Sequence, residues 1–345
     1  MSDLIGVIIV FLTSYAGVAA YRRWSERKGI FDLPNERSSH AEPTPRGGGL
    51  VIAAVCLSAY SILAYFGNGF VSWSYFAGAL VVVVISWLDD LYSVSFVVRL
   101  FCHTLAACLL VATAGGFETI NVSGTGVSLH LGAWGNVVAI LWIVWMINAY
   151  NFMDGIDGIA GLQAVVGGIG WWLFANAHSA NGIGLYSILV AAASLGFLLH
   201  NWQPARIFMG DAGSAFLGFT FAALPLLAAA ENHASGANFA FVGIVMVWFF
   251  LFDTIVTILT RTIKRQKIWT AHRDHLYQKM IIAGRSHRFV TTFYGVLSTI
   301  VIGSLFVTQN YSAGMSVLPI FFIVILSSVL YFTARENTKG VRRSE

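Results

Sequence analysis

The chain has 345 residues, of which 57% are hydrophobic and only 10% are charged, and its mean hydropathy is +0.74. This composition excludes an ordinary soluble globular domain, because repeated apolar runs near 20 residues indicate membrane-spanning helices. The formal net charge is +4 and the pI is about 9.0. The distribution of the basic residues decides what that charge means.

Eleven apolar runs are predicted to cross the membrane. They cover approximately residues 4–20, 49–66, 73–88, 98–114, 134–150, 160–176, 183–199, 215–230, 239–260, 290–308 and 314–333. An N-terminus outside the cell then gives cytoplasmic segments at residues 21–48, 89–97, 151–159, 200–214, 261–289 and 334–345.

The basic residues all fall on one predicted side. The cytoplasmic segments, together with Arg99 at a helix edge, contain all 20 Lys and Arg residues. This is the positive-inside rule in an extreme form. The high pI therefore reports membrane topology, and we expect no nucleic-acid partner. The sequence predicts an all-α polytopic membrane protein of about eleven transmembrane helices, with a cytoplasmic C-terminus. One external segment, residues 117–132, alternates polar and apolar residues, which predicts a short β-hairpin.

The first cytoplasmic segment has two halves of different character. Its basic first half, Arg22 to Lys28, is amphipathic and suits a position near anionic headgroups. In the second half Arg37, His40 and Arg46 are interleaved with prolines and three glycines. Fixed turns that carry cations suit a phosphate group. The alternative is a charge cluster that only sets topology.

Two adjacent carboxylates, Asp89 and Asp90, follow at the cytoplasmic end of the third run. Adjacent carboxylates at a membrane boundary repel each other, so one is expected to be protonated or to bind a metal. An ordinary helix cap is the alternative.

A longer polar stretch, residues 148–161, contains Asn148, Asn151, Asp154 and Asp157 at intervals of three. If the stretch is helical, these side chains share one face. Unpaired carboxylates beside lipid are costly. A hard divalent cation with oxygen ligands is a natural partner, and a polar loop with a turn is the alternative.

A third acidic position opens the eighth run. Asp211, Gly213 and Ser214 stand where a helix start offers free N–H groups and a positive dipole end. Asp211 could instead be a simple N-cap residue. Asp253 lies inside the ninth run, and intramembrane acids are functional candidates by default. Its alternatives are exposure to water or pairing with a cytoplasmic base.

The last large loop, residues 261–289, is strongly basic. Lys264 to Lys267 suit a topology-setting role. The group of His272, Arg273, Asp274 and His275 is more specific than such a charge cluster.

Five motifs, in this order and spacing, match one known family. They are Pro43-Thr-Pro-Arg-Gly-Gly48, Asp89-Asp90, Asn148 to Gly161, Asn201 to Ser214 and His272-Arg-Asp-His275. With them the chain resembles the polyprenyl-phosphate N-acetylhexosamine-1-phosphate transferases, and the O-antigen-initiating branch is nearest. Many relatives carry further histidines after His275, where this chain has Tyr277 and Gln278. That departure separates it from the MurNAc-pentapeptide translocase branch, which has a triple histidine.

The resemblance implies an activity and its cofactor. A sugar 1-phosphate of GlcNAc, FucNAc or QuiNAc type would pass from a UDP-sugar to undecaprenyl phosphate, releasing UMP, with Mg²⁺ or alternatively Mn²⁺. The resemblance implies one transferase domain over residues 1–345 in the bacterial inner membrane. It also implies a cytoplasmic active site and a homodimer. The active-site segments would be residues 30–48, 89–97, 148–161, 200–214 and 261–289.

The combined prediction assigns a role to each candidate residue. Catalytic roles are assigned to Asp89, Asp90, Asp154, His272 and His275. Substrate contacts are assigned to Arg37, His40, Arg46, Asn148, Asp157, Asn201, Arg206 and Arg273. Asn151 and Asp211 resemble the family's metal ligands.

Two alternatives concern function and mechanism. A secondary transporter would place its ionisable groups near the bilayer midplane, often in paired broken helices. Here they lie at helix ends, which favours the enzyme. Within the enzyme reading, the lipid phosphate attacks the UDP-sugar directly, or a phospho-aspartate forms first on Asp89 or Asp90. Both routes use the same residues.

Overall fold

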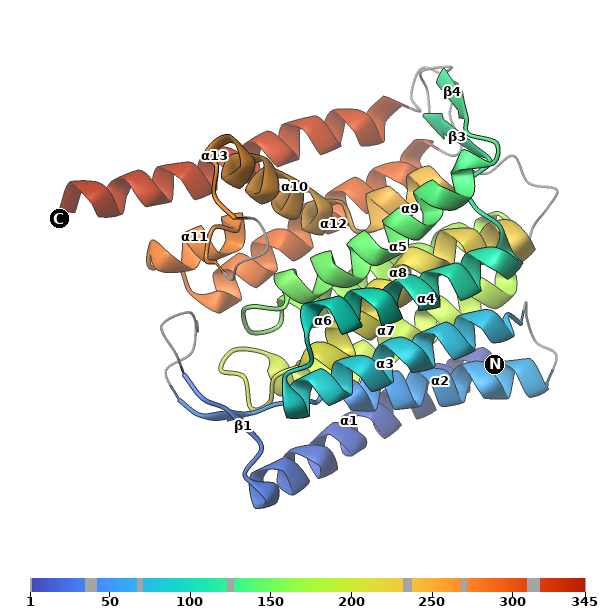
Figure 1. The fold of residues 1–345 in the computed structure, drawn as a ribbon, viewed down its shortest axis with the longest axis horizontal. Helices are drawn as coiled ribbons and strands as arrows, with labels where there is room; N and C mark the ends of the chain where they lie inside the picture. Colours follow the sequence, from blue (N-terminus) through green and yellow to red (C-terminus); the bar gives the residue numbers. More distant parts are fainter. Residues whose placement is uncertain are drawn as a thin grey trace.

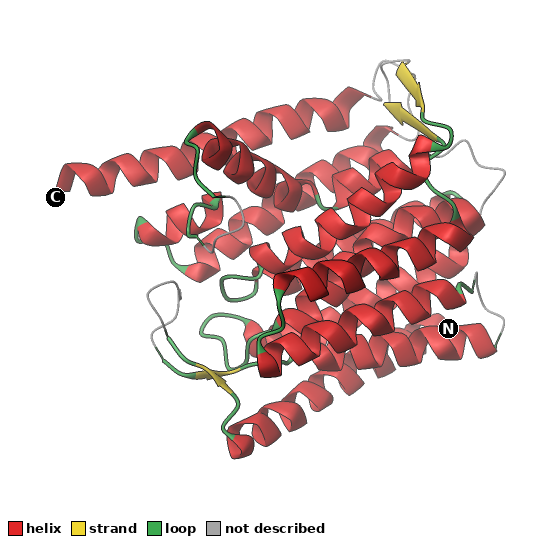
Figure 2. Ribbon diagram, in the orientation of Figure 1, coloured by secondary structure: helices red, strands yellow, loops and turns green. Residues whose placement is uncertain are grey.

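The computed structural model describes residues 2–34, 42–66, 71–122, 127–231, 238–267, 272–308 and 317–344. It is 79% helical, with two small two-stranded sheets (Figure 2). The elements are α1 (Ser2–Lys28), β1 (Phe31–Asp32), β2 (Thr44–Pro45), α2 (Gly49–Tyr65), α3 (Trp73–Tyr92), α4 (Phe96–Ala114), β3 (Thr119–Val122), β4 (Val127–His130), α5 (Trp134–Met153), α6 (Ile159–Ala177), α7 (Asn181–Asn201), α8 (Asp211–Glu231), α9 (Phe239–Met246), α10 (Trp248–Ile263), α11 (Leu276–Ile282), α12 (His287–Thr308) and α13 (Leu318–Ser344).

The helices form a bundle with the two ends of the chain at opposite ends of it (Figure 1). Among the described residues, nine helices are long and apolar enough to cross a membrane, and the bent pair α9–α10 makes ten. Helix α2 is shorter, with 17 residues. Each of the eleven predicted runs thus falls on a helix or on the bent pair. The all-α polytopic prediction is confirmed, whereas the number and orientation of the crossings stay predictions.

Helix α8 lies at the centre of the bundle. In the most apolar 18-residue segment of this helix, 94% of the residues are buried. The helix packs against α2, α3 and α5. A helix that is apolar on every side is expected in such a place. Glycine permits the closest approaches. A Cβ on Gly218 would lie 2.6 Å from the carbonyl oxygen of Met146 on α5, and one on Gly213 would lie 2.4 Å from the Cα of Gly49 on α2.

The predicted ninth span is broken. Helices α9 and α10 meet at an angle of 74° around Val247, which has non-helical backbone angles. The break leaves the Met246 carbonyl without a partner in its own helix, and the side chain of Gln163 donates to it at 2.7 Å. Ser298 in turn donates to the Gln163 amide oxygen at 2.9 Å. Irregular backbone at membrane depth is tolerated where the protein buries and satisfies it in this way.

The two ends of the bundle carry different structures (Figure 1). At one end β3 pairs with β4, with Thr119 opposite His130, which confirms the predicted hairpin. At the other end β1 pairs with β2, and the loop after α5, the loop before α8 and helix α11 lie at the same end. The bundle therefore presents its candidate functional residues at a single end.

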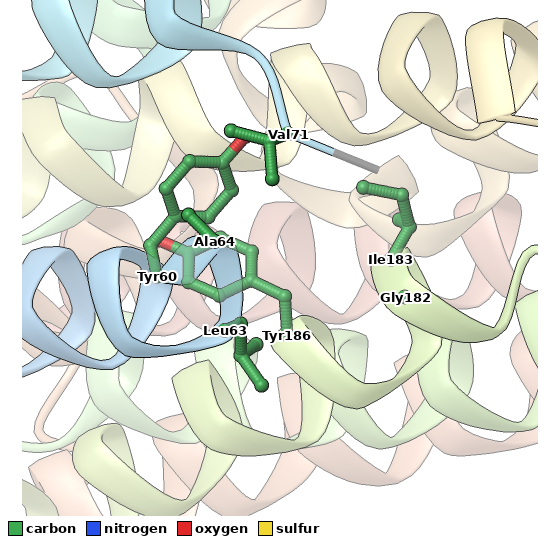
Figure 3. Close-up of a pocket in the computed structure, with 7 residues that line it drawn as sticks. All are labelled: Tyr60, Leu63, Ala64, Val71, Gly182, Ile183 and Tyr186. Carbon is green, nitrogen blue, oxygen red and sulfur yellow. The ribbon is translucent and has the colours of Figure 1, made fainter. Parts of the chain in front are cut away.

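A small cavity at the hairpin end is too small for a substrate. It is lined in part by Tyr60 and Tyr186 and has a volume of about 10 Å³, room for one water molecule (Figure 3). The Tyr75 hydroxyl joins those of Tyr186, at 2.8 Å, and Thr220, at 2.9 Å. These buried hydroxyl groups satisfy one another, so the cluster stabilises the core.

Candidate active site

Asp90 caps the central helix. Its side chain is 7% exposed, and its carboxylate accepts the backbone N–H groups of Asp211 and Ala212, each at 3.2 Å. A carboxylate at this place satisfies free amide groups and faces the positive end of the helix dipole. Arg46 follows β2 and pairs with the same carboxylate at 3.2 Å. The N-cap role considered for Asp211 thus belongs to Asp90, which is 121 positions earlier in the sequence.

Arg99 joins the other two carboxylates of the site. It lies in the first turn of α4, and its guanidinium contacts Asp89 at 2.5 Å and Asp211 at 3.6 Å. The side chains of Asn151 and Asp89 also lie beside the Asp211 carboxylate. Helices α3, α4, α5 and α8 therefore converge on one acidic cluster, which we define as Asp89, Asp90, Asn151 and Asp211. From the sequence Arg99 is predicted only to help set topology, although it is the one Lys or Arg between Arg46 and Arg206.

The acidic cluster has the donor atoms of a hard divalent cation. Asn151 and Asp211, the predicted metal ligands, lie side by side and could offer one carboxamide and one carboxylate oxygen, and Asp211 is about a third exposed. Within the described ranges, no group of three or more His, Cys, Asp or Glu side chains is arranged to hold a metal alone. Mg²⁺ is commonly bound by one or two carboxylates together with substrate phosphates. The pair fits such a shared site.

The polar stretch of residues 148–161 begins within α5 and is only partly helical. Helix α5 ends at Met153, so Asn148 and Asn151 lie on it, whereas Asp154 is its C-cap and Asp157 lies beyond. The condition for a shared helix face therefore holds for Asn148 and Asn151 and does not hold for Asp154 and Asp157. The Asn148 amide donates to a carbonyl of its own helix at 2.7 Å. Burial, and then the carboxylates of Asp211, Asp90 and Asp157, raise the pKa of Asp154 well above its usual value.

Asp157 links three segments of the protein. It is 9% exposed, and its carboxylate accepts the N–H of Ala205 at 3.1 Å and contacts the His287 ring at 3.1 Å. The Thr291 hydroxyl donates to its backbone carbonyl at 2.7 Å. These contacts hold the loop after α5 against the loop before α8 and against α12. The predicted substrate contact of Asp157 stays a prediction.

Asn201 has a similar structural position. It is 3% exposed, accepts the N–H of Gly158 at 2.9 Å and donates to the carbonyl of Ile207 at 2.9 Å. Both the oxygen and the nitrogen of its amide group are therefore hydrogen bonded to backbone groups. Arg206, in the same loop, is exposed, so of the two predicted substrate contacts it is the one with a side chain open to a ligand.

The glycine-rich segment after β2 is fixed by backbone hydrogen bonds. Gly47 and Gly48 donate to the carbonyl of Phe208 at 3.1 and 2.9 Å, and Gly49 donates to that of Met209 at 2.9 Å. These bonds place Arg46 against Asp90. The other two cations predicted for this segment, Arg37 and His40, lie outside the described residues.

The basic loop contains α11 and lies against the loop after α5. The His275 ring is buried and stacks with that of His272, with centroids 5.2 Å apart. Burial, and then the charges of His275 and Arg261, lower the pKa of His272 to about 4, so it is neutral at pH 7. Arg273 is half-buried. The Tyr277 hydroxyl donates to the Phe152 carbonyl at 2.9 Å, next to Asn151.

Comparison with known proteins decides the family. Residues 72–229 match the model of glycosyl transferase family 4. A decaprenyl-phosphate N-acetylglucosaminephosphotransferase from Mycobacterium leprae (strain TN) is 30% identical over an alignment of 322 residues, and the alignment covers 82% of this chain and 77% of the relative. The chain belongs to glycosyl transferase family 4.

Other members of family 4 are similar over comparable lengths. A probable undecaprenyl-phosphate N-acetylglucosaminyl 1-phosphate transferase from Bacillus subtilis (strain 168) is 28% identical over 332 residues, 95% of this chain and 92% of the relative. A phospho-N-acetylmuramoyl-pentapeptide-transferase from Synechococcus elongatus is 32% identical over 273 residues, 74% of this chain and 70% of the relative. The similarity thus extends well beyond the matched family model.

Proposed function

We propose that this family 4 protein transfers an N-acetylhexosamine 1-phosphate from a UDP-sugar to undecaprenyl phosphate and releases UMP. One observation carries the proposal. The Asp211 carboxylate lies in contact with Asn151, Asp89 and Arg99, which come from three other helices. Such a set of oxygen ligands beside a guanidinium suits a nucleotide diphosphate. The names of the relatives support the substrate classes.

The reaction needs charge neutralisation more than bond activation. Both substrates carry phosphate, so attack of one on the other is opposed by repulsion. Asn151 and Asp211 would hold Mg²⁺ or Mn²⁺, which when bound would neutralise charge on the diphosphate. Arg99 and Arg46 neutralise charge beside it. The His272–His275 group faces the loop after α5 and contributes further phosphate contacts.

Direct attack is the favoured route. An oxygen of the lipid phosphate forms a bond to the β-phosphorus of the UDP-sugar while the bond from that phosphorus to UMP breaks, and UMP leaves. A phospho-aspartate on Asp90 would take up one of the two carboxylate oxygens that accept from the α8 amide groups and pair with Arg46, and it would remove the carboxylate charge that they share. Asp89 is 10% exposed and paired with Arg99. The structure therefore supports positioning roles for these two carboxylates.

The donor and the cellular setting belong to the same proposal. The relatives named for N-acetylglucosamine favour GlcNAc over FucNAc and QuiNAc. The product would begin a lipid-linked cell-envelope polysaccharide such as O-antigen. Because nucleotide sugars are soluble in the cytoplasm, we place the site at the cytoplasmic face of the bacterial inner membrane.

UMP release by the purified protein tests the proposal. The assay combines undecaprenyl phosphate with UDP-GlcNAc, UDP-FucNAc, UDP-QuiNAc or UDP-MurNAc-pentapeptide, in Mg²⁺, Mn²⁺ or EDTA. We expect metal-dependent release with one N-acetylhexosamine donor. Asp211→Asn should raise the metal concentration needed for half-maximal rate, whereas Glu118→Gln, exposed at the hairpin end, should not.

Two outcomes would contradict the proposal. Release only with the pentapeptide donor would place the protein with the translocase branch. Folded protein that releases no UMP with any donor, yet moves a nucleotide sugar into vesicles, would establish a transporter.

A further inference from the structure

A carboxylate inside the membrane-spanning part of the protein holds the basic loop. Asp253 lies on α10 and is 0% exposed. Both of its oxygens are used. The donors to Oδ1 are His275 Nδ1 at 3.0 Å, the Leu276 N–H at 2.8 Å and the Thr257 hydroxyl at 3.2 Å. The donors to Oδ2 are the Tyr294 hydroxyl at 2.7 Å and the Tyr277 N–H at 3.1 Å.

Three of these five donors come from the start of α11, 22 to 24 positions away along the chain. Burying a carboxylate is costly unless it is fully hydrogen bonded. The whole set of donors satisfies Asp253, and it does so only when the basic loop is folded against α10. The carboxylate therefore favours one placement of α11.

The same contact fixes the chemistry of His275. An ionised carboxylate only accepts hydrogen bonds, so Nδ1 of the ring carries a proton and points to Asp253. Nε2 is the remaining polar atom of the ring. The ring thus presents Nε2 outward from α10 in a set orientation.

Tyr277 extends the link to the acidic side of the site. Its N–H donates to Asp253, and its hydroxyl donates to the carbonyl of Phe152, the residue after Asn151. A Cβ on Gly155 would lie 2.0 Å from that hydroxyl oxygen, so glycine leaves the space into which the ring fits. Tyr277, which stands where many relatives carry a histidine, therefore connects the basic loop to the loop after α5.

We propose that Asp253 is a positioning residue of the transferase. Its buried carboxylate orients the His275 ring and, through Tyr277, sets the separation between the basic loop and the acidic cluster. The inference rests on the proposed function, because phosphate groups bound between the two loops give His275 its task. Asp253 touches no substrate and acts only through these neighbours.

Asp253→Asn tests the role, since it keeps the volume and removes the charge. We expect kcat for UMP release to fall about 10- to 100-fold, as for other residues that orient a ligating or catalytic imidazole, with a smaller change in KM for the UDP-sugar. In a His275→Gln background the same substitution should lower kcat by a smaller factor, because only the route through Tyr277 then remains and coupled residues give non-additive effects. Thr254→Val is the matched control: this neighbour on α10 is 1% exposed and bonds only its own helix.

Hydrogen exchange gives a readout that does not depend on activity. In Asp253→Asn the Leu276 and Tyr277 amides should exchange faster, while those of α8 stay protected. If wild-type protein is inactive with every donor, the proposed function fails and exchange still decides whether Asp253 holds the loop.

Three results would overturn the inference. The first is wild-type kcat in folded Asp253→Asn protein, and the second is an equal fold-loss with and without His275. If Asp253→Asn is not recovered folded, Tyr277→Phe decides. That variant keeps every contact of Asp253 and removes only the hydroxyl that reaches Phe152. It should lower kcat, and unchanged kcat is the third result.

Discussion

We predict that the close contact between α2 and α8 sets the position of Asp211 and therefore the rate of UMP release, although neither glycine at this contact belongs to the acidic cluster. Gly49 and Gly213 face each other where the two helices start, and Asp211 lies two residues before Gly213. In Gly213→Ala the new Cβ would lie 2.4 Å from the Cα of Gly49. Non-bonded carbon atoms prefer about 3.5–4.0 Å. Because the obstacle is backbone, α8 must move by roughly 1 Å relative to α2.

The size of the effect follows from that displacement. Overpacking a well-packed core costs about 1–3 kcal/mol of folding free energy. A misplacement of about 1 Å in a catalytic group lowers the rate by about 100-fold. We therefore expect Gly213→Ala to remain folded, with a lowered unfolding temperature in detergent, and to lose about 100-fold in kcat for UMP release.

Gly303→Ala is the matched control. It is also a Gly-to-Ala change within a membrane-spanning helix, but a Cβ there would meet nothing within 4 Å. It should leave kcat unchanged and raise stability by about 0.5–1 kcal/mol. If Gly213→Ala retains kcat within about twofold of the control, the close approach of α2 and α8 does not position Asp211, and the reasoning is wrong.

Substitutions at three further positions test separate parts of the site. Arg99→Ala should lower kcat by about 100-fold, and Arg99→Lys by less, because the cation between Asp89 and Asp211 is lost or merely displaced; an unchanged UMP-release rate in Arg99→Ala would refute its role. Asn201→Ala should lower the free energy of unfolding by roughly 1–3 kcal/mol by leaving backbone groups unpaired; a raised KM for the UDP-sugar without destabilisation would instead establish a nucleotide contact. The pKa of His272 is about 4 when folded, against an ordinary value of 6.5, so the unfolded state binds the proton more readily, and stability is lost as pH falls from 6.5 to 4. Thermal unfolding of His272→Gln across this range should show a smaller loss than wild type, and an equal loss would contradict the assignment.

The hydropathy of the chain predicts most of its architecture. The apolar runs, the hairpin between β3 and β4, and the acidic residues at helix ends all follow from local properties of the sequence. Each depends on residues within about one helix length. The break at Val247 was missed, because the run stays apolar across it. The break depends on Gln163 donating to Met246 from a different helix.

Within the site, the sequence predicts which residues matter, whereas only tertiary contacts decide which residues they pair with. The sequence identified Asp89, Asp90, Asn151 and Asp211 as candidates because acidic and amide groups beside lipid need a partner. It left open which partner each of them has. Asp90 turned out to cap α8, and Arg99 turned out to join Asp89 and Asp211.

By itself, then, the sequence determined a multi-pass helical protein, its short hairpin and the polar residues near its functional end. Periodicity and hydropathy record these features, since they act along the chain. Only the tertiary structure decided how those residues are paired. Asp90 reaches α8 across 121 positions, and Asp253 reaches α11 across more than 20. Such pairs form because buried charges must be satisfied, and folding selects the partners by distance in space.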